Sequence, residues 1–461
     1  MRWLRPFVGV ALVSGVLLGC ASIQNAPVNL PGSDSLADKG NIGFGETTSF
    51  DDTIIGLSFS GGGTRAAAFS YGVLKEMERI PLRGAQRPMI DRVEFVSGVS
   101  GGSVTAAYYG LRKRAALADF RERFLLRNAE EGLQTSLTLA TLSRAAAGGI
   151  NDSTGFPRWL DANLFEGATF RDLGATSRPQ VWINASDIYN RTPFVFGAVA
   201  FGAMCSNLSE YPLANAVAAS AAVPVAFAPV VMQTFPGKCN ERLPQWIVRA
   251  RDNANAPPML SAFAKAISRY HDGSMPYIKL LDGGLVDNYG LAGMTIARLS
   301  SETPYGPLSP RQAVKLRRAL ILVVDAKTGL SGNWINTIEG PSGAELVKAA
   351  ADTAIDASVA GSFTAFNATM KDWQGALVRW RCGLSAADRA RYGAPAGWNC
   401  RDLKFYVGRI GFDQLEQSRA ADLERVPTRF NLPPEQVDSV IAAGGDALRA
   451  SPTFRSFAAG L

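Results

Sequence analysis

Short apolar runs alternate along the chain with longer segments whose apolar residues recur at helical spacing, starting near Thr53. The first run, Ile54–Phe59, predicts a buried strand, and the next segment, Ala66–Ile80, predicts a helix with one apolar stripe. Further strands are predicted at Val93–Val96, Val181–Ala185, Ile278–Leu281, Ala319–Val324 and Phe405–Ile410. Strands that alternate with helices favour a largely parallel sheet with helices on both faces. The expected fold class is therefore α/β, with three layers in the order α/β/α.

Four further segments have helix-forming composition. They are Ser103–Leu117, Glu122–Gly149, Ala344–Thr369 and Pro433–Phe457. The second of them is rich in alanine and leucine, and we interpret it as an inserted cap. No internal repeat or low-complexity segment is present. We expect a core domain over residues 51–330 and a mostly helical region over 331–461 packed on it.

The first twenty residues have the organisation of an export signal. Arg2 and Arg5 precede an apolar run, Phe7–Leu18, that is too short to span a bilayer comfortably. The run ends in Leu17-Leu18-Gly19-Cys20, which resembles the bacterial lipobox, a signal in which the cysteine is lipidated and becomes the mature N-terminus. The alternative is an ordinary export signal with an incidental cysteine.

The residues that follow Cys20 extend this interpretation. No aspartate stands beside the cysteine, and by resemblance to other lipoproteins of double-membraned bacteria this favours the outer membrane. Several acyl chains on one residue suffice for stable anchoring. Asn25–Phe50 is polar and rich in glycine, without apolar periodicity. We expect a signal peptide over residues 1–19, a lipidated N-terminus and flexible tether over 20–50, and a lipid-anchored place in the cell envelope, facing the periplasm.

The charge of the chain is modestly basic, with a net value of +7 and a pI near 9.2. Basic residues are scattered, the densest stretch being Arg112-Lys113-Arg114, and no nucleic-acid-binding motif is present. This balance is compatible with an anionic membrane surface. We expect no nucleic-acid partner.

Export makes the remaining cysteines candidates for disulfides. Cys205, Cys239, Cys382 and Cys400 form an even set in an oxidising compartment. Of the three pairings that four cysteines allow, proximity in the sequence favours Cys205–Cys239 with Cys382–Cys400. Four buried free thiols are the alternative. No Cys-x-x-Cys motif or histidine cluster indicates a metal, and we expect neither metal nor cofactor.

Ser100 stands in Gly98-Val99-Ser100-Gly101-Gly102, directly after a predicted strand. This Gly-x-Ser-x-Gly pattern is typical of a nucleophile elbow, in which a sharp backbone turn exposes the hydroxyl between a strand and a helix. A serine hydroxyl is a weak nucleophile and needs a base beside it. His271 is the only histidine of the chain, so either it completes a triad or a carboxylate acts directly as the base.

A glycine-rich segment, Ser60-Gly61-Gly62-Gly63-Thr64-Arg65, joins the first predicted strand to the following helix. Consecutive glycines leave backbone N–H groups unshielded, and a helix N-terminus adds the positive end of its dipole. This combination suits a phosphate or the oxyanion of a tetrahedral acyl intermediate. Because the lysine of a P-loop and the third glycine of a dinucleotide motif are absent, pairing with Ser100 favours an oxyanion hole. A turn whose glycines serve only close packing is the alternative.

A carboxylate follows another predicted strand, in Asp282-Gly283-Gly284. At the C-terminal end of a parallel strand, a carboxylate points into the crevice in which open α/β sheets place their sites. Taken alone, Asp-Gly-Gly is usually a turn. Asp187 and Asp287 also lie near strand ends, and for both a turn or loop role is the better interpretation.

In their order, these segments resemble the patatin-like phospholipases. That family carries a glycine-rich oxyanion segment with a trailing arginine, a Gly-x-Ser-x-Gly elbow and an Asp-Gly-Gly, here Gly61–Arg65, Gly98–Gly102 and Asp282–Gly284. Ala218–Pro224 resembles the small-residue stretch that the family places ahead of a proline. The resemblance covers Thr53–Leu291 and implies a patatin-like fold. One departure is Ser60, where many members have aspartate or glycine.

The resemblance implies a Ser–Asp dyad that works without histidine. It makes Ser100 the nucleophile and Asp282 the base, so a triad through His271 is disfavoured. The implied oxyanion donors are the N–H groups of Gly61, Gly62 and Gly63. Arg65 is expected to steady the glycine loop or to bind a lipid phosphate, and a plain surface arginine at a helix start is the alternative.

The function implied by the resemblance is hydrolysis of acyl esters in lipids by a phospholipase A-type enzyme, with membrane phospholipids as the expected substrates. Ala198–Met204 and Ala216–Val231 could line an acyl pocket or belong to the core. One alternative is a lipid acyltransferase, which passes the acyl group from Ser100 to an alcohol instead of water. The other is a non-catalytic envelope lipoprotein that keeps the fold.

Overall fold

A mostly parallel sheet organises the computed structural model, which describes residues 25–33, 52–81, 87–134, 144–145, 148–174, 178–240, 242–329 and 332–460. Its parallel strands are β1 (Thr53–Phe59), β2 (Val93–Val99), β3 (Gln180–Asp187), β7 (Arg318–Asp325) and β8 (Lys404–Gly411). The antiparallel strands are β4 (Thr192–Val195), β5 (Val230–Gln233) and β6 (Tyr277–Asp282). The strand order is β5-β6-β3-β2-β1-β7-β8, with β4 paired to β3. All predicted strands are present, and the α/β fold class is confirmed.

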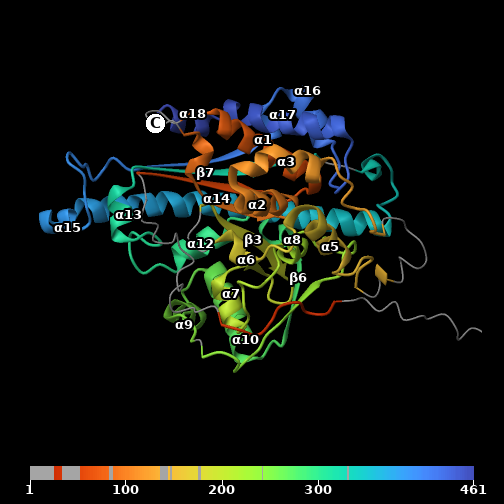
Figure 1. The fold of residues 1–461 in the computed structure, drawn as a ribbon, viewed down its shortest axis with the longest axis horizontal. Coiled ribbons are helices and arrows are strands. Elements are labelled where there is room, and N and C mark those ends of the chain that lie inside the picture. The colour runs from red at the N-terminus through yellow and green to blue at the C-terminus, as the bar shows by residue number, and fades with distance from the viewer. Residues whose placement is uncertain are drawn as a thin grey trace, which may run out of the picture.

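Helices cover both faces of this sheet (Figure 1). One face carries α1 (Gly63–Arg79), α2 (Gly101–Arg112) and α17 (Pro434–Ala450). The helices α1 and α17, which are far apart in the sequence, pack against each other. The other face carries α12 (Ala292–Leu299), α13 (Pro310–Lys315) and α14 (Gly343–Cys382). Two apolar clusters fill the spaces between the layers, a large one under the first face and a smaller one under the second.

The remaining helices connect the strands or cover their ends. They are α3 (Ala116–Phe120), α5 (Gly155–Leu160), α6 (Phe170–Leu173), α7 (Ala198–Ala203), α8 (Leu213–Ser220), α9 (Gln245–Asp252), α10 (Pro258–Asp272), α11 (Gly284–Asp287), α15 (Ala386–Arg391), α16 (Gln417–Glu424) and α18 (Pro452–Ala458). Short 3₁₀ turns lie at Met89–Arg92, Lys113–Ala115, Asn333–Asn336 and Phe412–Gln414, and π turns at Arg121–Leu125 and Asp161–Phe165.

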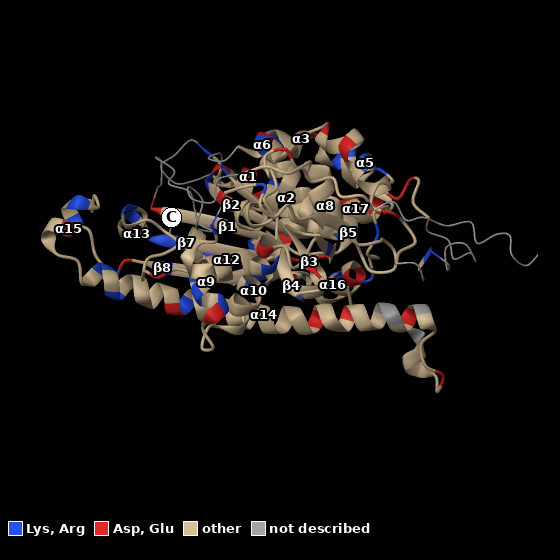
Figure 2. Cartoon of the chain, turned by 90° about the horizontal axis from the view of Figure 1, so that it is seen from below, with Lys and Arg blue, Asp and Glu red and all other residues tan. Residues whose placement is uncertain are grey.

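The longest helix, α14, runs along one side of the molecule (Figure 2). The face toward the sheet carries Phe366, Met370, Trp373 and Leu377, all buried. Figure 2 shows acidic residues on its first half and basic residues near its end. This distribution matches the helix dipole, whose negative end lies at the C-terminus. The helix is longer than the predicted Ala344–Thr369, because its apolar stripe continues to Leu377.

The predicted helix Glu122–Gly149 is wrong over residues 126–134, which form turns. The chain leaves the helical path there because it bonds to the C-terminal region. The N–H of Ala129 donates to the carbonyl of Phe430 at 3.0 Å, and Glu130 accepts the N–H of Phe430 at 2.8 Å. Residues 135–143 and 146–147 of the predicted cap lie outside the described residues.

Two other predicted helices are each broken once. Ser103–Leu117 is divided at Lys113, which has a positive φ of 55° that a continuous helix does not allow. Pro433–Phe457 is divided at Ser451, because Pro452 has no N–H to continue the helix and starts a new one. The Ser451 hydroxyl caps that second helix by accepting the N–H of Phe454.

Residues beyond 330 contribute to the sheet itself. β8 pairs with β7 along its whole length, from Lys404 opposite Arg318 to Gly411 opposite Asp325. A boundary at residue 330 therefore passes through one continuous sheet, and the 331–461 segment supplies its edge strand as well as α14 and α17.

Part of the predicted flexible tether lies against the body. The Asn29 side chain donates to the Ser206 hydroxyl at 3.0 Å and to the Gln233 carbonyl at 2.8 Å. The N–H of Gly32 donates to the Cys205 carbonyl. These bonds hold residues 29–32 against the body, so the prediction of a flexible segment is wrong for these four residues. The predicted signal peptide and Cys20 lie outside the described residues.

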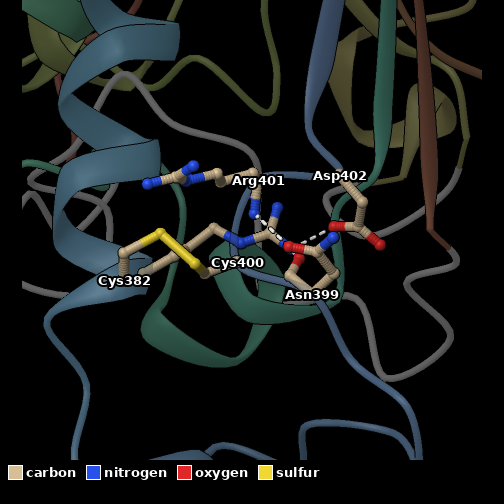
Figure 3. The surroundings of a disulfide bond; sticks show 6 residues. Cys382, Asn399, Cys400, Arg401 and Asp402 are labelled. Atoms are coloured by element: carbon tan, nitrogen blue, oxygen red, sulfur yellow. Dashed lines mark hydrogen bonds and ion pairs between the residues drawn. A yellow bond between two sulfur atoms is a disulfide. The ribbon is translucent and has the colours of Figure 1, made fainter.

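Both disulfides join cysteines that are close in the sequence. Cys205 is bonded to Cys239 with a Cα–Cα distance of 5.4 Å, and Cys382 to Cys400 with a distance of 5.0 Å. The second bond ties the end of α14 to the loop ahead of β8 (Figure 3). Beside it, the buried Arg381 donates to the Leu316 carbonyl and to Asp402.

Non-reducing peptide mapping of protein exported to the periplasm is expected to find these two linkages. Closing loops of this size constrains the unfolded chain and contributes about 3 kcal/mol per bond in the chain-entropy model. Reduction should therefore lower the melting temperature. Free thiols at all four positions in the exported protein would contradict the pairing.

Within the described part of the chain, no helix has the length and apolar content needed to cross a bilayer. The same residues contain no cluster of three or more histidine, cysteine or acidic side chains arranged to hold a metal.

Candidate active site

Ser100 occupies a sharp turn between the end of β2 and the start of α2. Its backbone has a φ of 52° and a ψ of −124°, a conformation that is costly for a residue with a side chain. The turn is held from both sides: the N–H of Ser100 donates to the Ser220 hydroxyl at 2.9 Å, and its carbonyl accepts the Ser103 hydroxyl at 2.6 Å. Ser220 in turn donates to the Asn184 carbonyl at 2.6 Å. This geometry agrees with the predicted nucleophile elbow.

The elbow lies directly against the glycine-rich loop. A Cβ atom on Gly101 would come within 1.9 Å of the Gly63 carbonyl oxygen, so only glycine fits there. A Cβ atom on Gly61 would lie 3.3 Å from the Cβ of Ser100. The two segments that were predicted to act together are therefore packed side by side.

Asp282 ends β6 and reaches Ser100 from the neighbouring part of the sheet. The Ser100 hydroxyl favours the charged form of its carboxylate, and the N–H of Gly284 donates to Oδ1 at 2.8 Å. The backbone is fixed as well, since the N–H of Asp282 donates to the Ala222 carbonyl at 2.8 Å. Burial raises the pKa of Asp282 to about 6, and the Gly284 N–H and the Ser100 hydroxyl oppose that rise.

The strand that carries Asp282 differs from the prediction. β6 runs antiparallel to β3, with Asp282 opposite Ala185, rather than parallel to it. β6 ends at Asp282, and its partner Ala185 directly follows Asn184, which pairs with Val99 at the end of β2. The carboxylate therefore lies at the end of β2, where the elbow begins. The side chain is 7% exposed and that of Ser100 is 4% exposed.

The three glycines of the loop differ in what their N–H groups contact. The N–H of Gly61 donates to Oδ1 of Asn288 at 3.1 Å and to the carbonyl of the same residue at 3.3 Å. Among the described residues, the N–H groups of Gly62 and Gly63 have no acceptor, and they open α1. The predicted oxyanion role therefore fits Gly62 and Gly63, whereas the Gly61 donor is already engaged.

Arg65 lies beneath the glycine loop and is only 2% exposed. Its guanidinium donates to the carbonyls of Ala326 at 2.9 Å and Val426 at 2.5 Å, and to the Thr428 hydroxyl at 3.0 Å. Burial lowers its pKa to about 10, which leaves it charged at neutral pH. These contacts fit the loop-supporting role, and a surface position is excluded by the burial.

The structure places the other candidate residues at a helix end or in turns. His271 is in the last turn of α10, ahead of the loop that leads into β6. Asp187 is buried in a turn, where it accepts the N–H groups of Tyr189 and Asn190. Asp287 accepts the N–H of Ala292 at 2.6 Å. Both carboxylates have the turn roles that the sequence favoured.

Ser220, Asn184 and Asn288 complete the site and were not identified from the sequence. The sequence contained a weak indication of Ser220, because it is a polar residue within Ala218–Pro224, the small-residue stretch that resembles the family. Asn184 and Asn288 had none, since their contacts with Ser220 and Gly61 join elements far apart in the chain.

The family model described as patatin-like phospholipase matches residues 57–294, more than half of the chain. The protein belongs to the patatin-like phospholipase family. The resemblance inferred from three short segments is therefore confirmed. Membership of the patatin-like phospholipase family supports a lipid acyl hydrolase in general terms.

Two solved structures are similar to this patatin-like protein. Human GIVD cytosolic phospholipase A2 is 12% identical, with a TM-score of 0.34, over 58% of this chain and 45% of that one. VipD from Legionella pneumophila is 13% identical, with a TM-score of 0.31, over 87% of this chain and 67% of that one. The match therefore spans less than half of the human chain. No curated protein has a significant sequence match to this chain.

Proposed function

We propose that this protein is a phospholipase A-type enzyme that hydrolyses lipid acyl esters with a Ser100–Asp282 dyad. The observation that carries the proposal is the position of the buried Asp282 carboxylate beside the buried Ser100, whose hydroxyl lowers the pKa of that carboxylate. The unengaged N–H groups of Gly62 and Gly63 lie on the loop packed against the same elbow. The proposal therefore assigns the nucleophile, the base and the oxyanion donors to neighbouring segments.

The proposed chemistry needs only these groups. Asp282 accepts the proton of Ser100 as Oγ attacks the ester carbonyl, and the charge that develops on the carbonyl oxygen is stabilised by the N–H groups of Gly62 and Gly63. Asp282 then gives the proton to the departing alcohol, and the C–O bond of the ester breaks. Water, deprotonated by the same carboxylate, hydrolyses the acyl-enzyme and frees Ser100.

A small, mostly apolar pocket lies near the site. Its lining includes Phe156, Ala218, Ala222, Phe227 and Val230, together with the polar residues Asp152 and Ser153. Ala218 and Ala222 flank Ser220, whose hydroxyl holds the elbow.

Between the pocket residues Ala222 and Phe227, the chain exposes Val223 and Val225 to solvent. An aggregated lipid would meet apolar side chains there. By contrast, α7, which covers most of the predicted pocket segment Ala198–Met204, is buried in the core around Phe201.

Product analysis on a mixed bacterial lipid extract tests the proposal. Wild-type protein is expected to release free fatty acid and lysophospholipid, identified by mass spectrometry, and Ser100→Ala is the matched control. Transfer of acyl groups to added glycerol or lysophospholipid, in place of release, would indicate an acyltransferase. Absence of both products, together with no reaction of Ser100 with a fluorophosphonate, would contradict a catalytic role.

The activity is expected to fall in acid with a midpoint near pH 6. Asp282 can accept the Ser100 proton only as the carboxylate, and burial raises its pKa to about 6. Activity is therefore present above that pH and is lost as the pH falls through it. The measurement is kcat/KM on a soluble ester, whose own ionisation does not change, between pH 4.5 and 9. A profile that is flat down to pH 4.5 would contradict the assignment of the base.

We also propose that Cys20 carries the lipid anchor, as the sequence resemblance to a lipobox suggests. Cys20→Ser is expected to leave an uncleaved or soluble form and to move the protein out of the detergent phase in Triton X-114 partitioning. Partitioning that does not respond to the substitution would indicate attachment by another part of the chain.

A further inference from the structure

The segment Asn288–Gly290 is held by polar side chains from the ends of four strands. Ser58 of β1 donates to the Tyr289 carbonyl, and Ser97 of β2 donates to the Gly290 carbonyl at 2.7 Å. Asn184 of β3 supports Ser97 through a bond of 2.8 Å to its hydroxyl. From β7, Asp325 accepts the Tyr289 hydroxyl at 2.7 Å and is paired with Arg409 at 3.1 Å.

This network restrains the segment at Tyr289 and Gly290. All four strand residues are buried, and a buried polar group that loses its partner costs about 1–3 kcal/mol. Gly290 has a φ of 65°, and a Cβ atom there would come within 2.7 Å of the Ser97 hydroxyl oxygen. The sheet therefore fixes the position of Asn288, although Asn288 itself takes no part in the network.

The side chain of Asn288 faces the catalytic groups. Its Oδ1 accepts the Gly61 N–H, while the Ser60 hydroxyl donates to the Gly61 carbonyl at 3.2 Å. Hydrogen bonds thus hold both the N–H and the carbonyl of Gly61. A Cβ atom on Gly284 would lie 2.8 Å from this Oδ1 and 3.1 Å from Oδ1 of Asp282, so the two side-chain oxygens are within about 6 Å of each other.

We propose that Asn288 is a positioning residue that holds the Gly61 peptide so that the N–H groups of Gly62 and Gly63 alone face the oxyanion. This inference rests on the proposed function and deepens it. A hydrogen bond from Gly61 to a fixed acceptor sets the direction of the loop before substrate arrives, which is the preorganisation that oxyanion stabilisation requires. Asn288 touches neither substrate nor the reacting atoms, and it acts through Gly61.

Removing the carboxamide is expected to lower kcat and leave KM nearly unchanged. In Asn288→Ala, Gly61 keeps only the longer of its two bonds, to the backbone carbonyl of residue 288. A small displacement of the loop then costs about 10- to 100-fold in kcat, because misplacement by 1 Å is enough for such a loss. The exposed Asn255→Ala is the control for loss of an asparagine side chain and is expected to match wild type.

Asn288→Asp separates positioning from packing. A carboxylate of the same shape still accepts the Gly61 N–H, so kcat at pH 9 should recover to within about fivefold of wild type, well above that of the alanine variant. The new charge also lies close to Asp282, whose carboxylate is otherwise governed by burial, the Gly284 N–H and the Ser100 hydroxyl. The acid limb of the rate profile should therefore move up by about one pH unit.

Hydrogen exchange of the peptide that contains residues 60–63 gives a readout independent of turnover. Faster exchange is expected in Asn288→Ala than in wild type, Asn255→Ala or Asn288→Asp. Equal exchange in all four proteins, or an aspartate variant no more active than the alanine variant at pH 9, would overturn the positioning role. If wild type and Ser100→Ala hydrolyse lipid equally poorly, the proposed function fails instead, and the exchange result still decides whether Asn288 holds the loop.

Discussion

Ser100→Ala and Asp282→Asn are each expected to lower esterase turnover by several orders of magnitude, whereas His271→Ala should retain most of it. The first substitution removes the nucleophile and the second removes the group that takes its proton. Residues that act as such a unit typically cost about 10⁴- to 10⁶-fold when one is lost. Steady-state kinetics on a soluble ester, with circular dichroism of each variant, is the measurement.

The histidine variant is the decisive control for this prediction. His271 lies in the last turn of α10, outside the three segments that carry the family motifs. The asparagine variant should fold normally, because a neutral amide does not carry the cost of burying a charge that raises the pKa of Asp282. If a folded His271→Ala were as inactive as Ser100→Ala, the dyad would be wrong.

Replacing Arg65 by methionine is expected to destabilise the protein by about 2–5 kcal/mol and to abolish most activity, because three acceptors lose a charged donor in the interior. The guanidinium joins the end of β7 to residues 426–428 under the glycine loop. A Cβ atom on Gly62 would lie 2.9 Å from its Nη2, so the loop rests on it. Urea denaturation and esterase kinetics measure both effects.

Two further variants show which role Arg65 has. Arg65→Lys can supply donors to only part of the three acceptors and should be intermediate in stability. Arg425→Met, at a guanidinium that is 74% exposed, is the control and should be close to wild type. An Arg65→Met protein of normal stability that had lost affinity for phospholipids, and not for an uncharged ester, would indicate phosphate binding.

The parts of the fold that the sequence predicted are those that depend on local pattern. Runs such as Ile54–Phe59 and Ala319–Val324 are apolar because both faces of a central strand are covered, and both runs became strands. An apolar run does not indicate the direction of its strand, and β6 was predicted to be parallel although it is antiparallel to β3. β4 and β5 were missed, since four residues are too few for a periodic signal.

The predicted helix after Glu122 failed for a related reason. Its composition favours a helix, but residues 126–134 form turns in which Ala129 and Glu130 hydrogen-bond to the distant Phe430. Such tertiary contacts override the helix propensity of the segment. Contacts between segments about 300 residues apart leave no trace in one sequence.

In the candidate site, too, local motifs could be predicted and long-range contacts could not. Ser100, Asp282 and the glycine loop were found because each needs a special residue type at a fixed spacing. The sequence could not distinguish the three glycines, because what separates Gly61 from Gly62 and Gly63 is a hydrogen bond to Asn288, 227 residues away. Ser220 and Asn184 support the elbow through bonds of the same long-range kind.

The most direct test of the dyad is the rate at which a fluorophosphonate labels each protein, followed by peptide mapping of the adduct. Wild type and His271→Ala should gain one adduct, on the peptide that contains Ser100, at similar rates. Asp282→Asn should label at least about 100-fold more slowly, because the hydroxyl has lost its base, and Ser100→Ala should not label. An adduct on another residue, or an Asp282→Asn protein that labels as fast as wild type, would contradict the account.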